Sequence, residues 1–280
     1  MTEPTSAAGG STADLLALLA QGVRTYDLSV PMEIGMAQSP NHPQFRLTMP
    51  RRHGDAVRAD GGSAANDLLV TGTHVGTHVD ALGHVSHCGQ LHGDLSADDT
   101  QRSGRLSALG VEEIEPMLGR GVLLDVAGAL GVDACEGGYE ITVSDLEATV
   151  AAQGTEPRPG DVVLIRSGWG RWWNTDADFV GAETGVPGVG EAGARWLASL
   201  GPRAVGADSI AFECLKAGAG HALLPAHRVL LVEAGVNIIE TLALEELAAD
   251  GRHEFLFVMT PLHLVGATGS PVRPLAVVLS

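Results

Sequence analysis

The sequence has few of the features that place a chain in the common structural classes. Only three of its 280 residues are cysteines, Cys88, Cys135 and Cys214, and none stands in CxxC spacing. An odd number of scattered cysteines predicts no disulfide framework and fits a reducing compartment. The N-terminus lacks the basic region of a signal peptide, and no run approaches the ~20 apolar residues of a membrane span. We therefore expect a cytoplasmic protein.

Basic residues are also scarce. The chain has 17 lysines and arginines against 34 acidic residues, and its net charge is -17. This charge argues against nucleic acid and against anionic membranes as partners. Gly-x-Ser-x-Gly and Walker A motifs are missing from the sequence, which disfavours serine hydrolases and P-loop proteins. A small-molecule substrate is the expected ligand.

Apolar and amphipathic segments alternate along much of the chain and predict an α/β fold. Hydrophobic residues make up 45 % of the sequence, enough to bury a large core. Strands are expected at 23–30, 121–127, 161–167, 204–208 and 236–241, and helices at 13–20, 142–154, 190–201 and 226–235. This alternation is typical of a mixed, partly parallel sheet with flanking helices. We expect a single domain over residues 11–280, after a disordered segment of residues 1–10.

Two segments lack clear periodicity. Residues 37–66 are rich in proline, histidine, arginine and glycine, and predict a long ordered loop or an arm. A segment of that length usually has a function or contacts another subunit. Phe45 and His53, within it, are candidates for the substrate site.

The second such segment, SGWGRWWN (167–174), carries Trp169, Trp172 and Trp173, three of the four tryptophans in the chain. Glycines flank the cluster, which is unlike a core stripe. We interpret it as a wall or lid over an aromatic substrate, since ligand pockets favour aromatic linings. A surface loop or a subunit contact is the alternative.

Residues 74–84, HVGTHVDALGH, are the most informative part of the chain. On an extended strand His74, His78 and Asp80 would point to one face, because side chains alternate. Gly76 and its β-branched neighbours disfavour a helix. Two imidazoles and a carboxylate that converge form a site for a divalent metal such as Zn²⁺ or Mn²⁺. His84 lies just beyond and is a candidate for proton transfer.

Two residues later in the chain could complete the site. Glu240 ends the apolar strand VNIIE, and His227 precedes it by thirteen positions at the start of a helical pattern. A strand end and a helix start are also ordinary places for exposed polar residues. We keep both side chains as possible metal ligands.

These residues would suit hydrolysis. A bound divalent ion lowers the pKa of water to about 7 or polarises a carbonyl, and His84 could act as the general acid or base. An amide, lactam, ester or lactone would be cleaved by such a site. The alternatives are a metal-dependent polyketide-type cyclase or lactonase, and a non-catalytic metal-binding protein.

The motif resembles the HxGTHxDxPxH signature of the cyclase family of metal-dependent hydrolases, which includes bacterial kynurenine formamidase and isatin hydrolase. The resemblance continues in DVVLIRSGW, AVGADS, AHRVLLVEAGVNIIE and GATGSPVRP, and covers about residues 24 to 278. It implies a swivelling β/β/α fold and an amidohydrolase that cleaves a C–N bond. Leu82 stands where the family has proline, which suggests a different or larger substrate.

The resemblance also implies roles for individual residues. His74, His78 and Asp80 would be metal ligands, and His84 the proton-transfer residue. His227 and Glu240 would complete a two-zinc site, whereas other members of the family use a single manganese. The implied cofactor is thus Zn²⁺ or Mn²⁺, one or two per chain. Members are usually homodimers or larger homo-oligomers, so we expect the same here.

Overall fold

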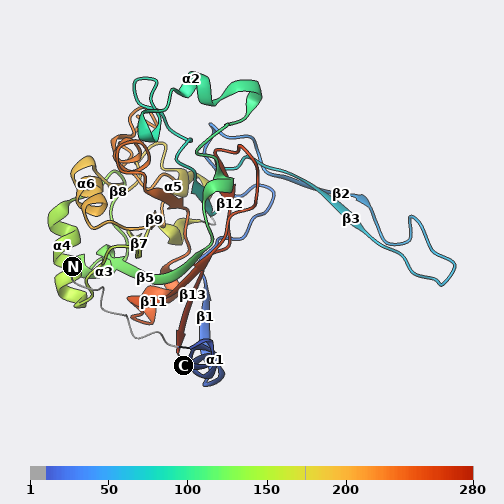
Figure 1. Cartoon of the computed structure of the whole chain (residues 1–280), viewed down its shortest axis with the longest axis horizontal. Coiled ribbons are helices and arrows are strands. Elements are labelled where there is room, and N and C mark those ends of the chain that lie inside the picture. The colour runs from blue at the N-terminus through green and yellow to red at the C-terminus, as the bar shows by residue number, and fades with distance from the viewer. Residues whose placement is uncertain (1–10, 174, 280) are drawn as a thin grey trace, which may run out of the picture.

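A curled nine-stranded mixed sheet organises the chain, with helices packed against it (Figure 1). The computed structural model describes residues 11–173 and 175–279, so the expected disorder of residues 1–10 lies outside it. The strand order is β1-β13-β11-β5-β7-β9-β10-β4-β12. The strands are β1 (Val23–Asp27), β4 (His78–Asp80), β5 (Met117–Asp125), β7 (Val162–Arg166), β9 (Ala204–Ala207), β10 (Asn237–Glu240), β11 (Glu254–Met259), β12 (Gly269–Pro271) and β13 (Leu275–Leu279). This arrangement confirms the predicted α/β class.

The middle of the sheet is parallel. Strands β5, β7, β9 and β10 run side by side in the same direction, and all other pairs in the sheet are antiparallel. Carboxyl ends of parallel strands meet at one edge of a sheet, where ligands bind in open α/β folds. The polar residues that follow these strands lie at this edge: Asp125, Ser167, Asp208 and Glu240.

Several of the helices cover one face of this parallel centre, whereas α8 contributes Leu247 to the cluster on the other face. Apolar side chains of α4, α6 and the π-helix pack with Val122, Val163 and Val205 in one buried cluster. Leu123 and Leu164, one position away, belong to a second cluster on the opposite face. Because both faces of these strands are buried, their sequences are continuous runs of apolar residues. The helices are α1 (Thr12–Ala20), α2 (Ala97–Thr100), α3 (Val126–Leu130), α4 (Val143–Gln153), α5 (Asp176–Val180), α6 (Glu191–Ser199), α7 (Pro225–His227), α8 (Glu245–Ala249), the short 3₁₀ turns at 92–94, 102–104, 111–113 and 169–172, and a π-helix, Arg228–Ala234.

Local sequence signals explain where α4 begins and ends. The Thr142 hydroxyl accepts from the backbone N–H of Asp145, and the Asp145 carboxylate accepts from the backbone N–H of Thr142. This capping box satisfies backbone donors that have no partner within the helix. Gly154 closes the helix in the left-handed conformation, with φ 65°.

The helix predicted at 226–235 differs from the expectation. Only Pro225–His227 is α-helical, and Arg228–Ala234 forms a π-helix. A π-helix inserts an extra residue per turn and is frequent at functional sites. Its position directly after His227 places the wider turn next to the candidate metal centre.

The segment predicted as a loop or arm is largely a β-hairpin. Strands β2 (Arg46–Arg51) and β3 (Asn66–Val70) pair only with each other and project far from the body of the protein (Figure 1). Every residue of both strands is exposed. The hairpin therefore confirms an arm and corrects the expectation of a segment without strands.

A small second sheet joins β6 (Glu140–Ile141) to β8 (Gly188–Val189) beside α4 and α6. Across residues 11–173 and 175–279, the helices are all too short or too polar to cross a lipid bilayer.

Candidate metal centre and its pocket

The HVGTHVDALGH segment turns sharply before it becomes a strand. His74 to Thr77 form a turn in which Gly76 has φ 67°, and only His78–Asp80 are strand β4. This corrects the expectation that alternation along one strand would align all three side chains. The left-handed conformation at Gly76 is one that residues with a Cβ rarely adopt. The turn at Gly76 brings His74 back toward Asp80.

Two groups of potential metal ligands form around Asp80. The first is His74, His78 and Asp80, and the second is Asp80, His227 and Glu240; within each group the ligand atoms lie within 4.8 Å of one another. Strand β10 pairs with β4 in a register that sets Glu240 opposite His78. The structure thus brings together all five residues that the sequence suggested as ligands.

The distances within the centre are short. His74 Nδ1 lies 2.7 Å from Asp80 Oδ1, and His78 Nε2 lies 3.4 Å from Glu240 Oε2. His227 Nε2 lies 3.1 Å from Glu240 Oε1 and 3.8 Å from Asp80 Oδ2. Asp80 is 1 % exposed. Its two oxygens face different imidazoles, which makes it the residue shared by both groups.

Hydrogen bonds outside the centre orient two of the imidazoles. His78 Nδ1 lies 2.8 Å from the carbonyl oxygen of Gly76, so Nδ1 donates and Nε2 faces the centre. His227 Nδ1 donates to Glu213 Oε2 over 3.0 Å, and Glu213 also accepts from the backbone N–H of Ala226. Partners of this kind fix the ring orientation and raise the basicity of histidine ligands.

The third imidazole is held in a similar way. His74 Nε2 lies 2.9 Å from the Thr268 hydroxyl, which leaves Nδ1 facing Asp80. Thr268 lies in the GATGSPVRP segment, far from the motif in sequence. All three rings therefore have one nitrogen bound from outside and the other directed inward.

One oxygen of Asp80 provides a test of whether this centre fits a cation. Among the described residues, Asp80 Oδ2 is buried and has no hydrogen-bond donor. A buried carboxylate oxygen without a partner is costly. Imidazole nitrogens and carboxylate oxygens are the usual ligands of Zn²⁺ and related divalent ions. The donor set and the unpaired oxygen both fit a bound divalent metal.

The pKa values point to the same need for positive charge. Burial lowers the pKa of His227, but hydrogen bonds to Glu213 and Glu240 outweigh burial and raise it to about 10. Burial raises the pKa of Asp80, yet the neighbouring imidazoles of His84 and His74 hold it well below its usual range. The buried carboxylates thus favour the protonated, positively charged form of the nearby imidazole. A divalent cation would balance the same negative charge with a higher positive charge.

His84 stands beside the centre without belonging to either group. Its ring stacks on that of His74, with centroids 3.9 Å apart and planes at 25°. Burial lowers the pKa of His84 to about 4, although Asp80 acts in the opposite direction. A neutral imidazole at the edge of the cavity can accept a proton. His84 thus lines the cavity beside the candidate ligands, and its role in proton transfer stays a prediction.

A cavity of about 40 Å³ adjoins the centre. One part of its wall is apolar and the other carries imidazoles. The lining includes Trp173, Ile210, Leu224, His42, His84 and His221, besides His74, His78, His227 and Glu240. The cavity therefore combines apolar and polar lining groups, as expected for a small-molecule site.

The other residues that the sequence suggested for substrate binding lie outside this lining. Trp169 is buried and donates through Nε1 to the carbonyl oxygen of Phe179, whereas Trp172 is 39 % exposed, with the guanidinium of Arg171 over its ring. Phe45 packs in an apolar cluster that also contains the cavity residues Trp173 and Ile210. His53 lies on the exposed hairpin, where its Nδ1 is 3.3 Å from the Ser63 hydroxyl.

Four residues near the centre were missed by the sequence interpretation. Glu213 and Thr268 hold ligand imidazoles from outside, and His42 and His221 line the cavity. His42 also stacks on His74, with ring centroids 5.6 Å apart. Both cavity residues are histidines that can be seen in the sequence. Nothing in the sequence indicates that they lie near the motif, because the contact forms only when the chain folds.

Known proteins resemble the chain along most of its length. The profile of the putative cyclase family matches residues 26–214, more than half of the chain. A kynurenine formamidase from Sphingopyxis alaskensis is 27 % identical over 254 residues, which are 89 % of this chain and 96 % of that protein. An isatin hydrolase from Roseibium aggregatum is 28 % identical over 225 residues, 79 % of this chain and 77 % of that protein.

Solved structures agree with the sequence matches. A crystal structure of a novel cyclase aligns with a TM-score of 0.82 at 29 % identity and covers 95 % of this chain and 93 % of the other. Isatin hydrolase A from Ralstonia solanacearum shares the fold, with a TM-score of 0.73 at 22 % identity, over 98 % of this chain and all of the other. With a family profile across more than half of its residues, the chain belongs to the cyclase family.

Proposed function

We propose that the protein is a metal-dependent hydrolase that cleaves a C–N bond in an aromatic N-acyl or cyclic amide. The observation that carries the proposal is Asp80, a buried carboxylate shared by two ligand groups and left with one unpaired oxygen. His84 and an apolar wall stand at the same cavity. Relatives with the names kynurenine formamidase and isatin hydrolase support this reaction class.

Each ligand group is proposed to hold one divalent ion. His74, His78 and Asp80 offer two nitrogens and an oxygen, a set that suits Zn²⁺. His227, Asp80 and Glu240 offer one nitrogen and two carboxylates, which suit Zn²⁺ or Mn²⁺. The shared Asp80 would couple the two sites, because its loss removes a ligand from both.

The residues of the chain would divide the work of hydrolysis. A bound divalent ion supplies a water of lowered pKa and polarises the substrate carbonyl. His84 accepts the proton as the water oxygen bonds to the carbonyl carbon. The same imidazole then delivers that proton to the leaving nitrogen as the C–N bond breaks. Glu213 and Thr268 keep the neighbouring imidazoles in place throughout.

The cavity walls indicate how the substrate would lie. Trp173, Ile210 and Leu224 present an apolar surface for a ring, and His42 and His221 present polar nitrogens. A benzene-sized ligand occupies a cavity of about 150 Å³, more than the 40 Å³ present. An aromatic substrate would therefore displace part of the apolar wall when it binds.

We also propose that the protein is a homo-oligomer, with the hairpin β2–β3 lying on a second copy of the chain. A hairpin of two strands is marginally stable alone, and this one exposes Leu47, Met49, Leu68, Leu69 and Val70 by about half each. Residues 46–70 contain four arginines and three aspartates, whereas the whole chain has a net charge of -17. The hairpin is thus both apolar and opposite in charge to the body of another copy.

The state of the cysteines supports the expected reducing, cytoplasmic compartment. Cys88 is exposed, Cys135 is buried and Cys214 is half-buried, and all three are free.

We predict that the protein retains close to two divalent ions per chain, and that Asp80→Asn reduces this to near zero because both sites lose a ligand. Glu240→Gln should retain about one ion, since the group of His74, His78 and Asp80 stays complete. Elemental analysis after gel filtration measures the content. Asp161→Asn alters a buried aspartate at the start of β7 and serves as control. Full metal content in Asp80→Asn would contradict the ligand assignment.

The reaction class is tested by adding Zn²⁺ or Mn²⁺ to the metal-free protein and assaying N-formylkynurenine, isatin, and related lactams and lactones. We expect hydrolysis of at least one amide or lactam. The reaction is measured by the change in absorbance as the product forms. Activity restricted to lactones would replace the amidohydrolase assignment with that of a lactonase.

On the best substrate of that screen, His84→Ala should lower kcat by at least about a hundredfold, the low end of general acid–base catalysis. Its metal content should match that of the wild type, because His84 belongs to neither ligand group. His263→Ala, at an exposed position, is the control. A decrease of less than tenfold would show that His84 does not transfer the proton.

Light scattering coupled to gel filtration should give the mass of a dimer or a larger homo-oligomer. Leu69→Asp, on the hairpin, should shift the equilibrium toward the monomer, because it places a charge in an apolar contact. Leu223→Asp changes a leucine that is 81 % exposed on another loop and should have no effect. A wild-type monomer at micromolar concentration would refute the proposed contact.

A further inference from the structure

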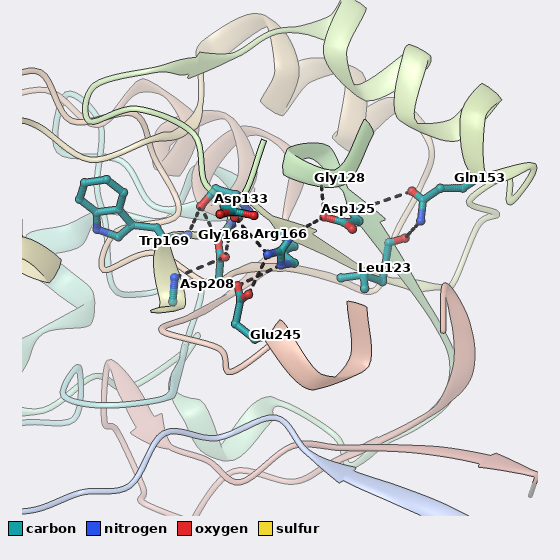
Figure 2. A network of polar contacts seen from close by, with 12 residues as sticks. Leu123, Asp125, Gly128, Asp133, Gln153, Arg166, Gly168, Trp169, Asp208 and Glu245 are labelled. Carbon is teal, nitrogen blue, oxygen red and sulfur yellow. Dashed lines mark hydrogen bonds and ion pairs between the residues drawn. The ribbon is translucent and has the colours of Figure 1, made fainter. Parts of the chain in front are cut away.

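Asp208 is a buried carboxylate that belongs to neither ligand group. It follows β9 at the carboxyl edge of the sheet and is 0 % exposed. Its Oδ1 accepts from the backbone N–H and the hydroxyl of Ser167, over 2.9 and 2.6 Å. Its Oδ2 accepts from the backbone N–H of Gly168 over 2.8 Å and of Gly170 over 3.5 Å. Figure 2 shows this carboxylate beneath the turn that leads to Trp169.

These bonds determine the path of the chain toward the cavity. The Ser167 hydroxyl, which donates to Asp208, also accepts from the backbone N–H of Trp169 over 3.2 Å. Gly168 has φ 79°, and a Cβ there would lie 2.3 Å from the carbonyl oxygen of Asp133. Only glycine therefore fits this position of the turn. It continues into the 3₁₀ helix of residues 169–172 and then into Trp173, which lines the cavity.

The guanidinium group next to the turn pairs with carboxylates other than that of Asp208. Arg166, one residue before the turn, pairs with Asp125 over 2.7 Å and with Glu245 over 2.7 Å (Figure 2). The carboxyl oxygens of Asp208 are held instead by the N–H and O–H donors of the turn. Burial raises the pKa of Asp208, and the hydrogen bonds from Ser167 act in the opposite direction.

Asp208 also connects the turn to a second part of the cavity lining and to the candidate metal centre. Ile210 and Ala211, two and three residues later, line the same cavity as Trp173. Between them and Asp208, the carbonyl oxygen of Ser209 accepts from the backbone N–H of Thr241, the residue after Glu240. A shift at Asp208 would thus move Trp173 relative to Ile210.

We propose that Asp208 is a positioning residue that places Trp173 against the ring of the substrate, and so determines which aromatic groups the cavity accepts. The inference rests on the proposed function. The cavity is too small for an aromatic ring unless the side chains of its apolar wall move. The backbone that carries Trp173 therefore limits how far this wall can be displaced.

The test is Asp208→Asn, which keeps the size of the side chain but directs an N–H group at the N–H donors of the turn. With formanilide, a single-ring aryl formamide, KM should rise about tenfold while kcat changes less than about threefold, the size expected for altered contacts in an apolar pocket. Tryptophan emission should shift to longer wavelength. The metal content should stay at the wild-type value.

Asp161→Asn is the matched control. Asp161 is also buried, at the opposite end of β7, and accepts from the backbone N–H of Arg158 over 2.7 Å. This variant should leave the KM for formanilide and the emission spectrum unchanged. An unchanged KM in folded Asp208→Asn would overturn the inference, and so would a loss of metal from it.

If Asp208→Asn does not fold, Ser167→Ala decides the question. It removes the hydroxyl between Asp208 and the N–H of Trp169 but leaves the carboxylate, so KM should rise in the same direction by a smaller factor. No rise would refute the inference.

Binding of acetophenone, an aryl ketone without a C–N bond, separates this inference from the proposed function. Weaker binding to Asp208→Asn, measured by tryptophan fluorescence, would support the positioning role even if the wild type cleaved no amide. Equal binding to both proteins would refute that role whatever the wild type hydrolyses.

Discussion

The buried charge of Asp80 is the constraint on which the arrangement of the site depends. The carboxylate belongs to the last residue of β4 and is 1 % exposed, with the carboxylate of Glu240 close by. Buried negative charges persist only when positive groups or several hydrogen-bond donors surround them. Three imidazoles provide these groups from the turn at Gly76, from β4 and from α7. The pairing of β4 with β10 and the position of α7 are therefore tied to the same charge balance.

Much of the centre could be predicted from residues 74–84, because the candidate ligands His74, His78 and Asp80 are close in sequence. The way they converge could not. Alternating β-branched residues predict a strand, whereas the left-handed conformation of Gly76 makes a turn. Glu213 was missed for a different reason. It supports His227 across 14 positions of sequence, a contact made by packing and absent from any local pattern.

In the fold as well, features with a local sequence signal could be predicted, and features without one could not. The capping box of α4 is visible in the sequence because its partners, Thr142 and Asp145, are three residues apart. The apolar runs of β5 and β7 are equally clear, since both faces of these strands are buried. The hairpin of β2 and β3 gave no such signal. Neither of its faces is buried in one chain, so no alternation of apolar and polar residues is required.

The hairpin has a consequence for how this protein can diversify. It joins the nine-stranded sheet through no ladder of backbone hydrogen bonds, so insertions or deletions at its tip shift no register in the core. Residues 46–70 can therefore change in length and sequence while the carboxyl edge of the sheet keeps its chemistry. Natural variation in this protein should concentrate there.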